Sequence, residues 1–360
     1  MDTAETYRDF ARHQAAGASP LYQALTAGVA GDPELLYFLD SLPAPKRQPN
    51  LLLAAVRYLD GTGDSYPAFR AFVVEHLDEI RTTMLERRTQ TNEVGRCATL
   101  LPLLAQLPPP LALLEVGASA GLCLLPDRYG YDYDGRRIGP RESPVQLRCH
   151  VTGPAPIPAE LPEVAWRAGV DLNPLDVHDR DDVRWLEALV WPGQPERVAR
   201  LRAAVHLAQE EQLRIVRGDL NQELAGVAAQ APADATLVVF HSAVLVYLSP
   251  EDRTRFQEQV RRLPGHWVAN EDPAVLPEAA GRVGRGQAGR GRPQGERAGF
   301  LLALDGDSPI GYTAPHGQWL DWLTPATAAG TAGGSLRRPA EAARGGQSVA
   351  EERLRSGRRP

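Results

Sequence analysis

The residues best suited to chemistry lie in a short segment with alternating glycines, formed by Glu115, Gly117, Ser119 and Gly121. The apolar run LALLEV precedes this segment, and LCLLPDRY, which has a helical pattern, follows it. A strand that enters a helix through a glycine-containing turn is typical of nucleotide-binding α/β domains. Glycine permits backbone angles that a Cβ excludes, and small residues such as Ala118 leave room for a ligand against the backbone. The segment therefore predicts a site for a nucleotide-like cofactor.

The spacing of this turn distinguishes between cofactors. It departs from the G-x-G-x-x-G pattern of dinucleotide sites, and the acid two positions before Gly117 suits hydroxyl or amino groups better than a pyrophosphate. We therefore expect S-adenosylmethionine rather than NAD. The alternative is a tight strand-to-helix turn that binds no ligand, because glycine and alanine also serve that purpose.

Polar side chains end the strands that we expect further along the chain. Apolar runs at 165–172, 213–220, 236–245 and 266–272 alternate with helical patterns, which predicts a mostly parallel sheet covered on both faces. Ligands bind beyond the carboxyl ends of such strands. The polar residues at these ends are Asp171, Asn173, Asp219, His241, Ser242, Asn270, Glu271 and Asp272. All of them would lie along one rim of the sheet.

Asp171 is the candidate for hydrogen bonds with ribose hydroxyls, because it ends the strand expected beside the glycine turn. It lies well beyond the spacing of about 20 residues that is usual for such an acid, so we expect an insertion near residues 130–160. Asp132 and Asp134 are rival acids at nearer spacing. A helix cap or Asx turn is the structural alternative for Asp171.

Asp219 would lie where adenine binds in a methyltransferase-type site, and its alternative role is a helix cap. For methyl transfer, His241 is the candidate general base, with Tyr247 and Glu271 as secondary candidates. Few catalytic groups are needed, because transfer from an activated sulfonium relies mainly on proximity and alignment. No G-x-S-x-G sequence surrounds Ser242, which argues against a serine hydrolase.

Composition limits the classes of protein that remain. The chain has 360 residues, 43% of them hydrophobic, which suffices for a substantial core. It starts with a polar segment and has no apolar run near the roughly 20 residues that span a bilayer, so we expect a cytoplasmic protein without membrane contact. Three cysteines without a C-x-x-C pair predict buried reduced thiols and no metal site.

The charge is unevenly distributed. Residues 281–297 carry five arginines and one glutamate, residues 324–360 carry seven arginines and three glutamates, and yet the whole chain has a net charge of −6. The remaining body is therefore acidic, which argues against nucleic acid as its main partner. Both arginine-rich segments have the composition of solvated disordered chain.

The pattern along the chain predicts three parts. We expect a helical N-terminal cap over residues 1–107, an α/β domain over 108–323 with a flexible loop at 281–297, and a disordered tail over 324–360. The runs FLLALDG and PIGYTAP predict an antiparallel hairpin at a sheet edge near the carboxyl end.

Several of these segments resemble an uncharacterised bacterial domain-of-unknown-function family, found mainly in actinobacteria and similar in pattern to class I S-adenosylmethionine-dependent methyltransferases. The most specific are LLEVGASAGL and VVFHSAVLVYL. The resemblance implies a Rossmann-like sheet of the methyltransferase type with a helical cap. It implies the methionine-side contacts Glu115, Gly117, Ser119 and Gly121, the ribose contact Asp171, and the adenine contacts Asp219 and Leu220. It also places Thr91, Asn92, Glu93 and Arg96 on a helix that closes over the ligand.

The expected function is therefore an S-adenosylmethionine-dependent methyltransferase with a small-molecule acceptor, whose identity the sequence does not specify. The first alternative is a non-catalytic or regulatory protein that keeps the fold and its ligand. The second is another nucleotide-dependent α/β enzyme. Neither the sequence pattern nor the composition indicates an oligomeric state.

Overall fold

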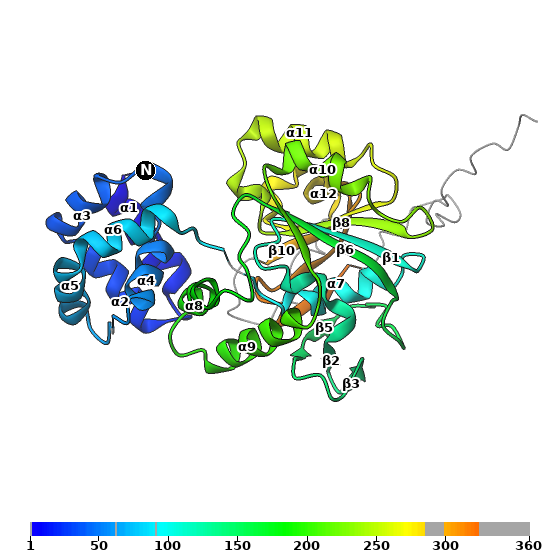
Figure 1. Cartoon of the computed structure of the whole chain (residues 1–360), viewed down its shortest axis with the longest axis horizontal. Coiled ribbons are helices and arrows are strands. Elements are labelled where there is room, and N and C mark those ends of the chain that lie inside the picture. Colours follow the sequence, from blue (N-terminus) through cyan, green and yellow to red (C-terminus); the bar gives the residue numbers. More distant parts are fainter. Residues whose placement is uncertain (1, 62, 91, 285–298, 324–360) are drawn as a thin grey trace, which may run out of the picture. The chain divides into compact units, whose positions relative to one another are not determined.

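The structure is a computed structural model that describes residues 2–61, 63–90, 92–284 and 299–323 (Figure 1). Most of the predicted loop 281–297, all of the predicted tail 324–360, and Thr91 lie outside the described residues.

The first third of the chain is helical. Its elements are α1 (Thr3–Asp9), the π-helical turn η1 (Phe10–Ala15), α2 (Pro20–Val29), α3 (Pro33–Asp40), the 3₁₀ turn η2 (Ala44–Lys46), α4 (Pro49–Tyr58), α5 (Tyr66–Glu75) and α6 (Leu77–Glu86). Local sequence explains their starts: Ser19 and Asp32 accept backbone N–H groups of the first turns of α2 and α3, and proline follows each cap. The helical pattern of residues 66–88 is divided at His76, where φ is −110° and ψ is 33°.

A nine-stranded sheet forms the centre of the α/β part. Its strands are β1 (Leu111–Val116), β5 (His150–Thr152), β6 (Val164–Asp171), β7 (Arg214–Arg217), β8 (Thr236–Ser242), β9 (His266–Glu271), β10 (Phe300–Leu304), β11 (Ser308–Thr313) and β12 (Trp319–Trp322). Their order is β5-β12-β11-β10-β9-β8-β1-β6-β7. The five strands from β9 to β7 are parallel, and β10 and β11 form antiparallel pairs. The chain therefore has an α/β fold with a large, mostly parallel sheet.

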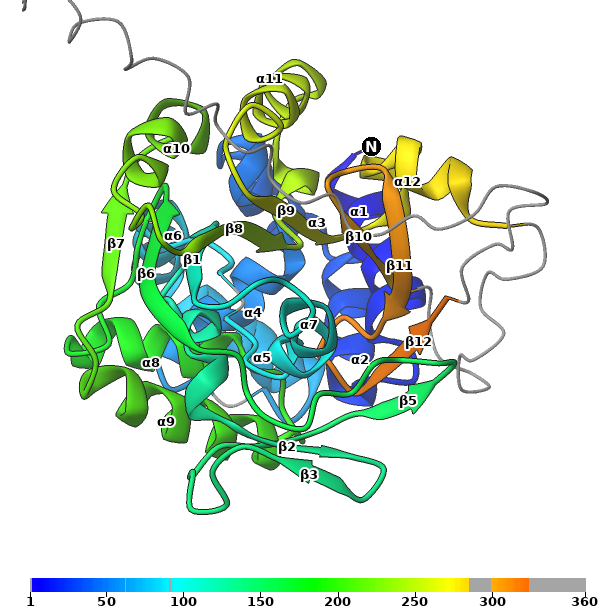
Figure 2. The same ribbon diagram turned by 90° about the vertical axis from the view of Figure 1, so that its right-hand side faces the viewer.

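Both faces of this sheet are covered, as Figure 2 shows. Helices α10 (Leu220–Ala228), α11 (Pro250–Val260) and α12 (Pro277–Arg282) pack on the face that carries Leu114 and Val116. Helices α7 (Arg96–Leu104) and α9 (Pro195–Gln209) belong to the core on the face of Leu111 and Leu113. Side chains of β1 therefore pack into two cores, one on each face of the sheet, because successive side chains of a strand point to opposite faces.

Two further elements complete the fold. Helix α8 (Arg180–Leu189) packs on α4, and the Nη1 atom of Arg57 donates to the carbonyl oxygen of Ala188 at 3.1 Å. Strands β2 (Gly130–Tyr133), β3 (Arg136–Ile138) and β4 (Gln146–Arg148) form a separate three-stranded sheet within the segment 130–160.

Two local predictions were wrong. No α-helix follows β1, where only the 3₁₀ turns η3 (Leu122–Leu124) and η4 (Pro126–Arg128) form. The helix is interrupted because Pro126 lacks an N–H group and disfavours helical angles at the preceding residue. The β10–β11 hairpin also exists but does not form the sheet edge, since β12 and β5 extend the sheet beyond it.

Candidate functional site

The glycine turn lies at the carboxyl end of β1, between β6 and β8. Gly117, Ser119 and Gly121 all have positive φ, at 71°, 53° and 75°. A Cβ on Gly121 would lie 2.6 Å from Cδ1 of Ile215, and a Cβ on Gly117 would lie 2.4 Å from Cγ2 of Val244. Glycine is therefore required here both for conformation and for close packing.

The backbone N–H groups of the turn are largely used within the protein. Gly117 and Ala118 donate to the oxygen of Val170, Ser119 to Oδ2 of Asp171, Gly121 to the oxygen of Ala118, and Leu122 to Oδ1 of Asn92. A phosphate group requires several free N–H donors. The turn is consequently unsuited to a pyrophosphate, and it offers side-chain acceptors instead.

Glu115 and Ser119 supply polar atoms that lack partners. Glu115 is 5% exposed and Ser119 is 3% exposed, and neither Oε2 of Glu115 nor Oγ of Ser119 has a hydrogen-bond partner among the described residues. Burial raises the pKa of Glu115 well above its usual value. Buried polar atoms without partners are uncommon and indicate capacity for a ligand or water.

Asp171 lies beside this turn, as the prediction for the ribose contact requires. Its Oδ2 accepts the N–H of Ser119 at 2.8 Å, and its Oδ1 accepts the N–H of Asn173 at 2.7 Å. The second bond is the Asx turn given above as the alternative role. Gln90 also contacts both residues, donating to Oδ1 of Asp171 at 3.3 Å and to the oxygen of Asn173 at 2.6 Å.

The rival acids lie elsewhere. Asp132 belongs to β2 and accepts the N–H of Gly135 at 2.7 Å, and Asp134 follows β2 and accepts from His150 at 2.8 Å. Both contacts belong to the turn between β2 and β3 and the start of β5. Of the three candidate acids, only Asp171 contacts the glycine turn.

Asn92 and Arg96 reach the rim from the segment that precedes β1. The side chain of Asn92 joins both ends of the glycine turn, because it donates to the oxygen of Ala118 at 3.3 Å and accepts the N–H of Leu122 at 2.9 Å. Arg96 is buried and donates to the carbonyl oxygens of Pro315 and Ser242 at 2.9 and 3.0 Å. Helix α7 begins only at Arg96, so the expectation that Asn92 lies on the same helix was wrong.

Asp219 caps helix α10. Its side chain accepts the N–H of Asn221 at 2.8 Å, which is the alternative role given above, and Leu220 is buried in the core between the sheet and α10. The cap accounts for the aspartate without a ligand, and the adenine contact stays a prediction.

The candidate catalytic residue His241 is enclosed. It is 0% exposed, its Nδ1 lies 2.7 Å from Oε1 of Glu271, and the Nε1 group of Trp267 donates to its Nε2 at 2.8 Å. Since Nε2 accepts this bond, Nδ1 carries the proton, and no nitrogen is left to receive one. Both ring nitrogens of His241 are thus engaged within the protein, and its role as general base stays a prediction.

Glu271 and Tyr247 also differ from their expected roles. The Oε1 atom of Glu271 accepts the N–H groups of Val244 and Leu245 at 2.7 and 3.1 Å, so this fully buried side chain holds the turn after β8. Val244 in that turn covers Gly117. Tyr247 lies in the 3₁₀ turn η5 (Leu245–Tyr247) and is 67% exposed.

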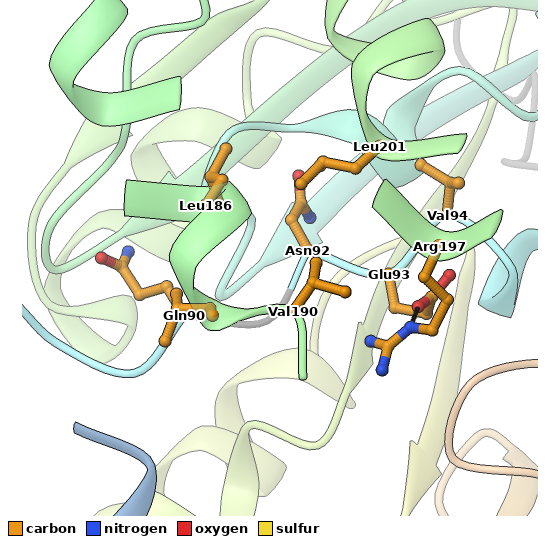
Figure 3. Close-up of a pocket in the computed structure, with 9 residues that line it drawn as sticks. Gln90, Asn92, Glu93, Val94, Leu186, Val190, Arg197 and Leu201 are labelled. Carbon is orange, nitrogen blue, oxygen red and sulfur yellow. Dashed lines mark hydrogen bonds and ion pairs between the residues drawn. The ribbon is translucent and has the colours of Figure 1, made fainter. Parts of the chain in front are cut away.

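A buried cluster of charged side chains, which was not predicted, lies next to the segment that contacts the glycine turn. Glu93 is 6% exposed, and its Oε2 accepts from Nε of Arg197 at 2.6 Å while its Oε1 accepts from Nη2 of Arg200 at 3.0 Å. The pair Glu93–Arg197 lies in a pocket between residues 90–94 and the α8–α9 region (Figure 3). The partners are more than 100 positions apart, so no local pattern could reveal them.

The cluster has strongly shifted pKa values. Burial would raise the pKa of Glu93, but the positive charges of Arg197 and Arg200 hold it below the usual value. Burial, together with the same arginines and Arg96, lowers the pKa of His316 to about 3. At pH 7 the cluster thus holds an ionised Glu93 and a neutral His316.

Other kinds of site find no support in the part of the chain that the structure describes. That part holds no group of three or more His, Cys, Asp or Glu side chains placed to bind a metal ion. None of its helices is long and apolar enough to cross a membrane. Cys97, Cys123 and Cys149 are buried free thiols, as predicted.

Comparison with known protein families finds a match over most of the chain. The sequence model of a family described as "uncharacterized protein conserved in bacteria" matches residues 4–322. No curated protein matches the chain.

Proposed function

The chain belongs to the DUF2332 family of uncharacterized bacterial proteins, and we propose that it is an S-adenosylmethionine-dependent methyltransferase that acts on a small-molecule acceptor. The observation that carries this proposal is the buried carboxyl group of Glu115 at the end of the central strand, whose pKa burial raises and whose Oε2 has no partner among the described residues. In the turn that follows β1, the buried Oγ of Ser119 likewise has no partner among the residues that the structure describes.

The strand order supports a Rossmann-like interpretation of the sheet. The parallel strands run β7-β6-β1-β8-β9, so that the first strand in the chain is central and the connections proceed outward in both directions. In such sheets ligands bind at the carboxyl ends where the direction of the connections changes, which here is between β1 and β8. Glu115, Ser119 and Ser242 lie at this place.

The chemistry of the donors and acceptors favours an adenosyl cofactor over a dinucleotide. The turn has few free N–H groups for phosphates, whereas the oxygens of Glu115, Ser119 and Asp171 can accept from an ammonium group and ribose hydroxyls. Arg96 is the nearby cation that would face a carboxylate. These residues fit S-adenosylmethionine, which supplies an already activated methyl group when bound.

In this reaction the residues of the chain would orient the bound groups and keep water away from them. Asn92 fixes both ends of the turn, and Glu271 fixes the turn that places Val244 over Gly117. These contacts orient the rim and exclude water from it. Because His241 is enclosed, the acceptor itself has to be nucleophilic at neutral pH or lose its proton to solvent.

The experiment is calorimetric titration of the full chain with S-adenosylmethionine, S-adenosylhomocysteine and NAD. We expect micromolar binding of both adenosyl compounds and none of NAD, with binding lost in Glu115→Ala and Asp171→Ala. Asp134→Ala is the matched control, because Asp134 lies away from the turn and pairs with His150. If the folded wild-type protein binds neither adenosyl compound, the proposal is wrong.

A non-catalytic ligand-binding protein is the second candidate, and the enclosed His241–Glu271 pair favours it. Incubation with radiolabelled S-adenosylmethionine and a panel of small acids, amines and phenols distinguishes the two. Tight cofactor binding without transfer to any member of the panel would support the non-catalytic protein.

A further inference from the structure

A cavity of about 190 Å³ lies within the helical N-terminal part of the chain. Helices α2, α4 and α5, which lie close together in Figure 1, form most of its wall, and Pro192 contributes from the connection between α8 and α9. An apolar cavity of about 150 Å³ is known to admit a benzene molecule. This cavity, here called the α2–α4 cavity, is therefore large enough for a benzene ring with a small substituent.

The wall of the α2–α4 cavity is mainly apolar and includes two aromatic rings. The side chains of Tyr22 and Phe69 are both buried and both line it. Aromatic rings pack well against a further ring in offset or edge-to-face geometry, and burial of a ring is favourable in itself. The aliphatic residues of the wall are Leu21, Leu25, Leu53 and Val56.

Arg57 brings a positive charge to this wall. Its side chain is half-buried, and its Nη1 donates to the carbonyl oxygen of Ala188 at 3.1 Å. The exposed Asp64 also lines the cavity, but within the described part of the chain no carboxylate forms an ion pair with Arg57. A guanidinium group has five N–H donors and favours an anionic acceptor. The cavity therefore offers a charged group that an anion would complement.

The hydroxyl group of Tyr22 lies beside this guanidinium group. Burial raises the pKa of Tyr22 to about 12, and the charge of Arg57 and its hydrogen bond to Tyr22 oppose that rise. The hydroxyl group is protonated at neutral pH and can donate a hydrogen bond. Arg57 and Tyr22 thus place two kinds of donor side by side in an apolar wall, which suits the two oxygens of a carboxylate.

We propose that the α2–α4 cavity binds a small aromatic carboxylate, of which benzoate is the simplest. Arg57 and Tyr22 would donate to the carboxylate, and the ring would lie against Phe69 and the leucines. An inorganic anion would leave the apolar wall without contacts, and an uncharged ring would leave Arg57 without an anion. The proposal does not depend on the methyltransferase function, because none of the described residues that line the cavity belongs to the glycine turn or to the strand ends.

Benzoate is the probe for this site, with benzamide and acetate as comparisons, each titrated by calorimetry into the full chain at constant ionic strength. We expect benzoate to bind at least about tenfold more tightly than benzamide, the difference that one charged hydrogen bond makes. Acetate should bind at least about tenfold more weakly too, because it lacks the ring whose burial stabilises the complex. Equal binding of either comparison would overturn the proposal, as would no binding of benzoate.

Variants of the chain assign the binding to the cavity. Arg57→Gln should weaken benzoate binding by about tenfold, and Arg57→Lys should weaken it less, because lysine keeps the charge. Arg12→Gln is the matched control and should leave binding unchanged, because Arg12 is an exposed residue of η1. A loss in Arg57→Gln no larger than that in Arg57→Lys or Arg12→Gln contradicts the site.

A last variant separates this cavity from the rim of the sheet. Asp171→Ala removes the proposed ribose contact and should bind benzoate as the wild type does. An equal loss in Asp171→Ala and Arg57→Gln would overturn the assignment to the α2–α4 cavity. The comparison of benzoate with benzamide uses the wild-type chain alone, so it decides the proposal even where a variant fails to fold.

Discussion

Two neighbouring regions each bury one glutamate, and they shift its pKa in opposite directions. At the junction with α9, Glu93 has two arginine partners and a lowered pKa. At the end of β1, Glu115 has no ion-pair partner and a raised pKa. Both side chains are almost fully buried, so burial alone does not determine the charge of an acid. The partners within reach determine it.

The difference separates a structural contact from a place for a ligand. Glu93 is saturated with donors and connects the segment before α7 to α9. Glu115 has spare hydrogen-bonding capacity at the strand end, because its Oε2 has no partner among the described residues. The same substitution at both positions therefore tests whether this distinction is real.

The largest effect is expected for Glu93→Gln. It leaves two partly buried arginines without a negative charge, which should lower the free energy of unfolding by about 3 to 5 kcal/mol. Urea denaturation followed by circular dichroism measures the loss. Arg202→Gln is the control, because its exposed pair with Glu187 should contribute at most about 1 kcal/mol. If Glu93→Gln lowers the free energy of unfolding no more than Arg202→Gln does, Glu93 does not differ from Glu115 in the way described.

The groups at the junction with α9 should also account for most of the fall in the free energy of unfolding at acid pH. His316 has a folded-state pKa of about 3, so between about pH 6.5 and pH 3 only the unfolded state takes up its proton, and stability falls as pH falls. Glu93 adds a loss below its unfolded pKa, because its folded pKa is lower. We expect His316→Gln to reduce the loss between pH 7 and pH 4.5 by about 2 kcal/mol. Parallel profiles for variant and wild type would contradict this.

The turn itself can be probed with Gly117→Ala. Its φ of 71° and the 2.4 Å approach to Val244 predict a loss of about 1 to 3 kcal/mol. Gly135→Ala is the matched control, since Gly135 has a φ of 95° but open space around its Cβ position. The excess loss at Gly117, read from thermal unfolding, measures how firmly Val244 covers the turn.

The smallest effect is expected for Glu115→Gln. A neutral acid is replaced by a neutral amide of the same size, so the free energy of unfolding at pH 5 should change by less than about 1 kcal/mol. Above the unfolded pKa, wild-type stability falls as pH rises, because only the unfolded state releases the proton of Glu115. The variant should lack this decline. A large loss at pH 5 would show that Glu115 is charged like Glu93.

Much of the fold was predictable because its signals are local. Apolar runs between helical patterns located β1, β6, β8 and β9, and proline or serine caps marked helix starts such as that of α2. The interruption after β1 was missed, although Pro126 indicates it. The three-residue strands of the small sheet were too short to show a period.

The location of the candidate site was predictable from the sequence, but the environments of its residues were not. Strand ends indicated that Glu115, Asp171 and His241 share the carboxyl end of the sheet, and the structure places them there. Their environments depend on residues far away in the chain. Only the folded chain shows that Trp267 donates a hydrogen bond to His241. The same is true of the arginine of α9 that pairs with Glu93.

The sheet edge formed by β5 and β12 constrains the order in which strands can pair while the chain is being synthesised. β5 leaves the ribosome before β6, yet its sheet partner is β12, and Thr152 and Asp321 in this pair are 169 positions apart. A nascent chain therefore carries β5 without its neighbour until nearly the whole α/β part has been made. Such late, long-range closure slows folding and leaves a strand edge open to other chains in the meantime.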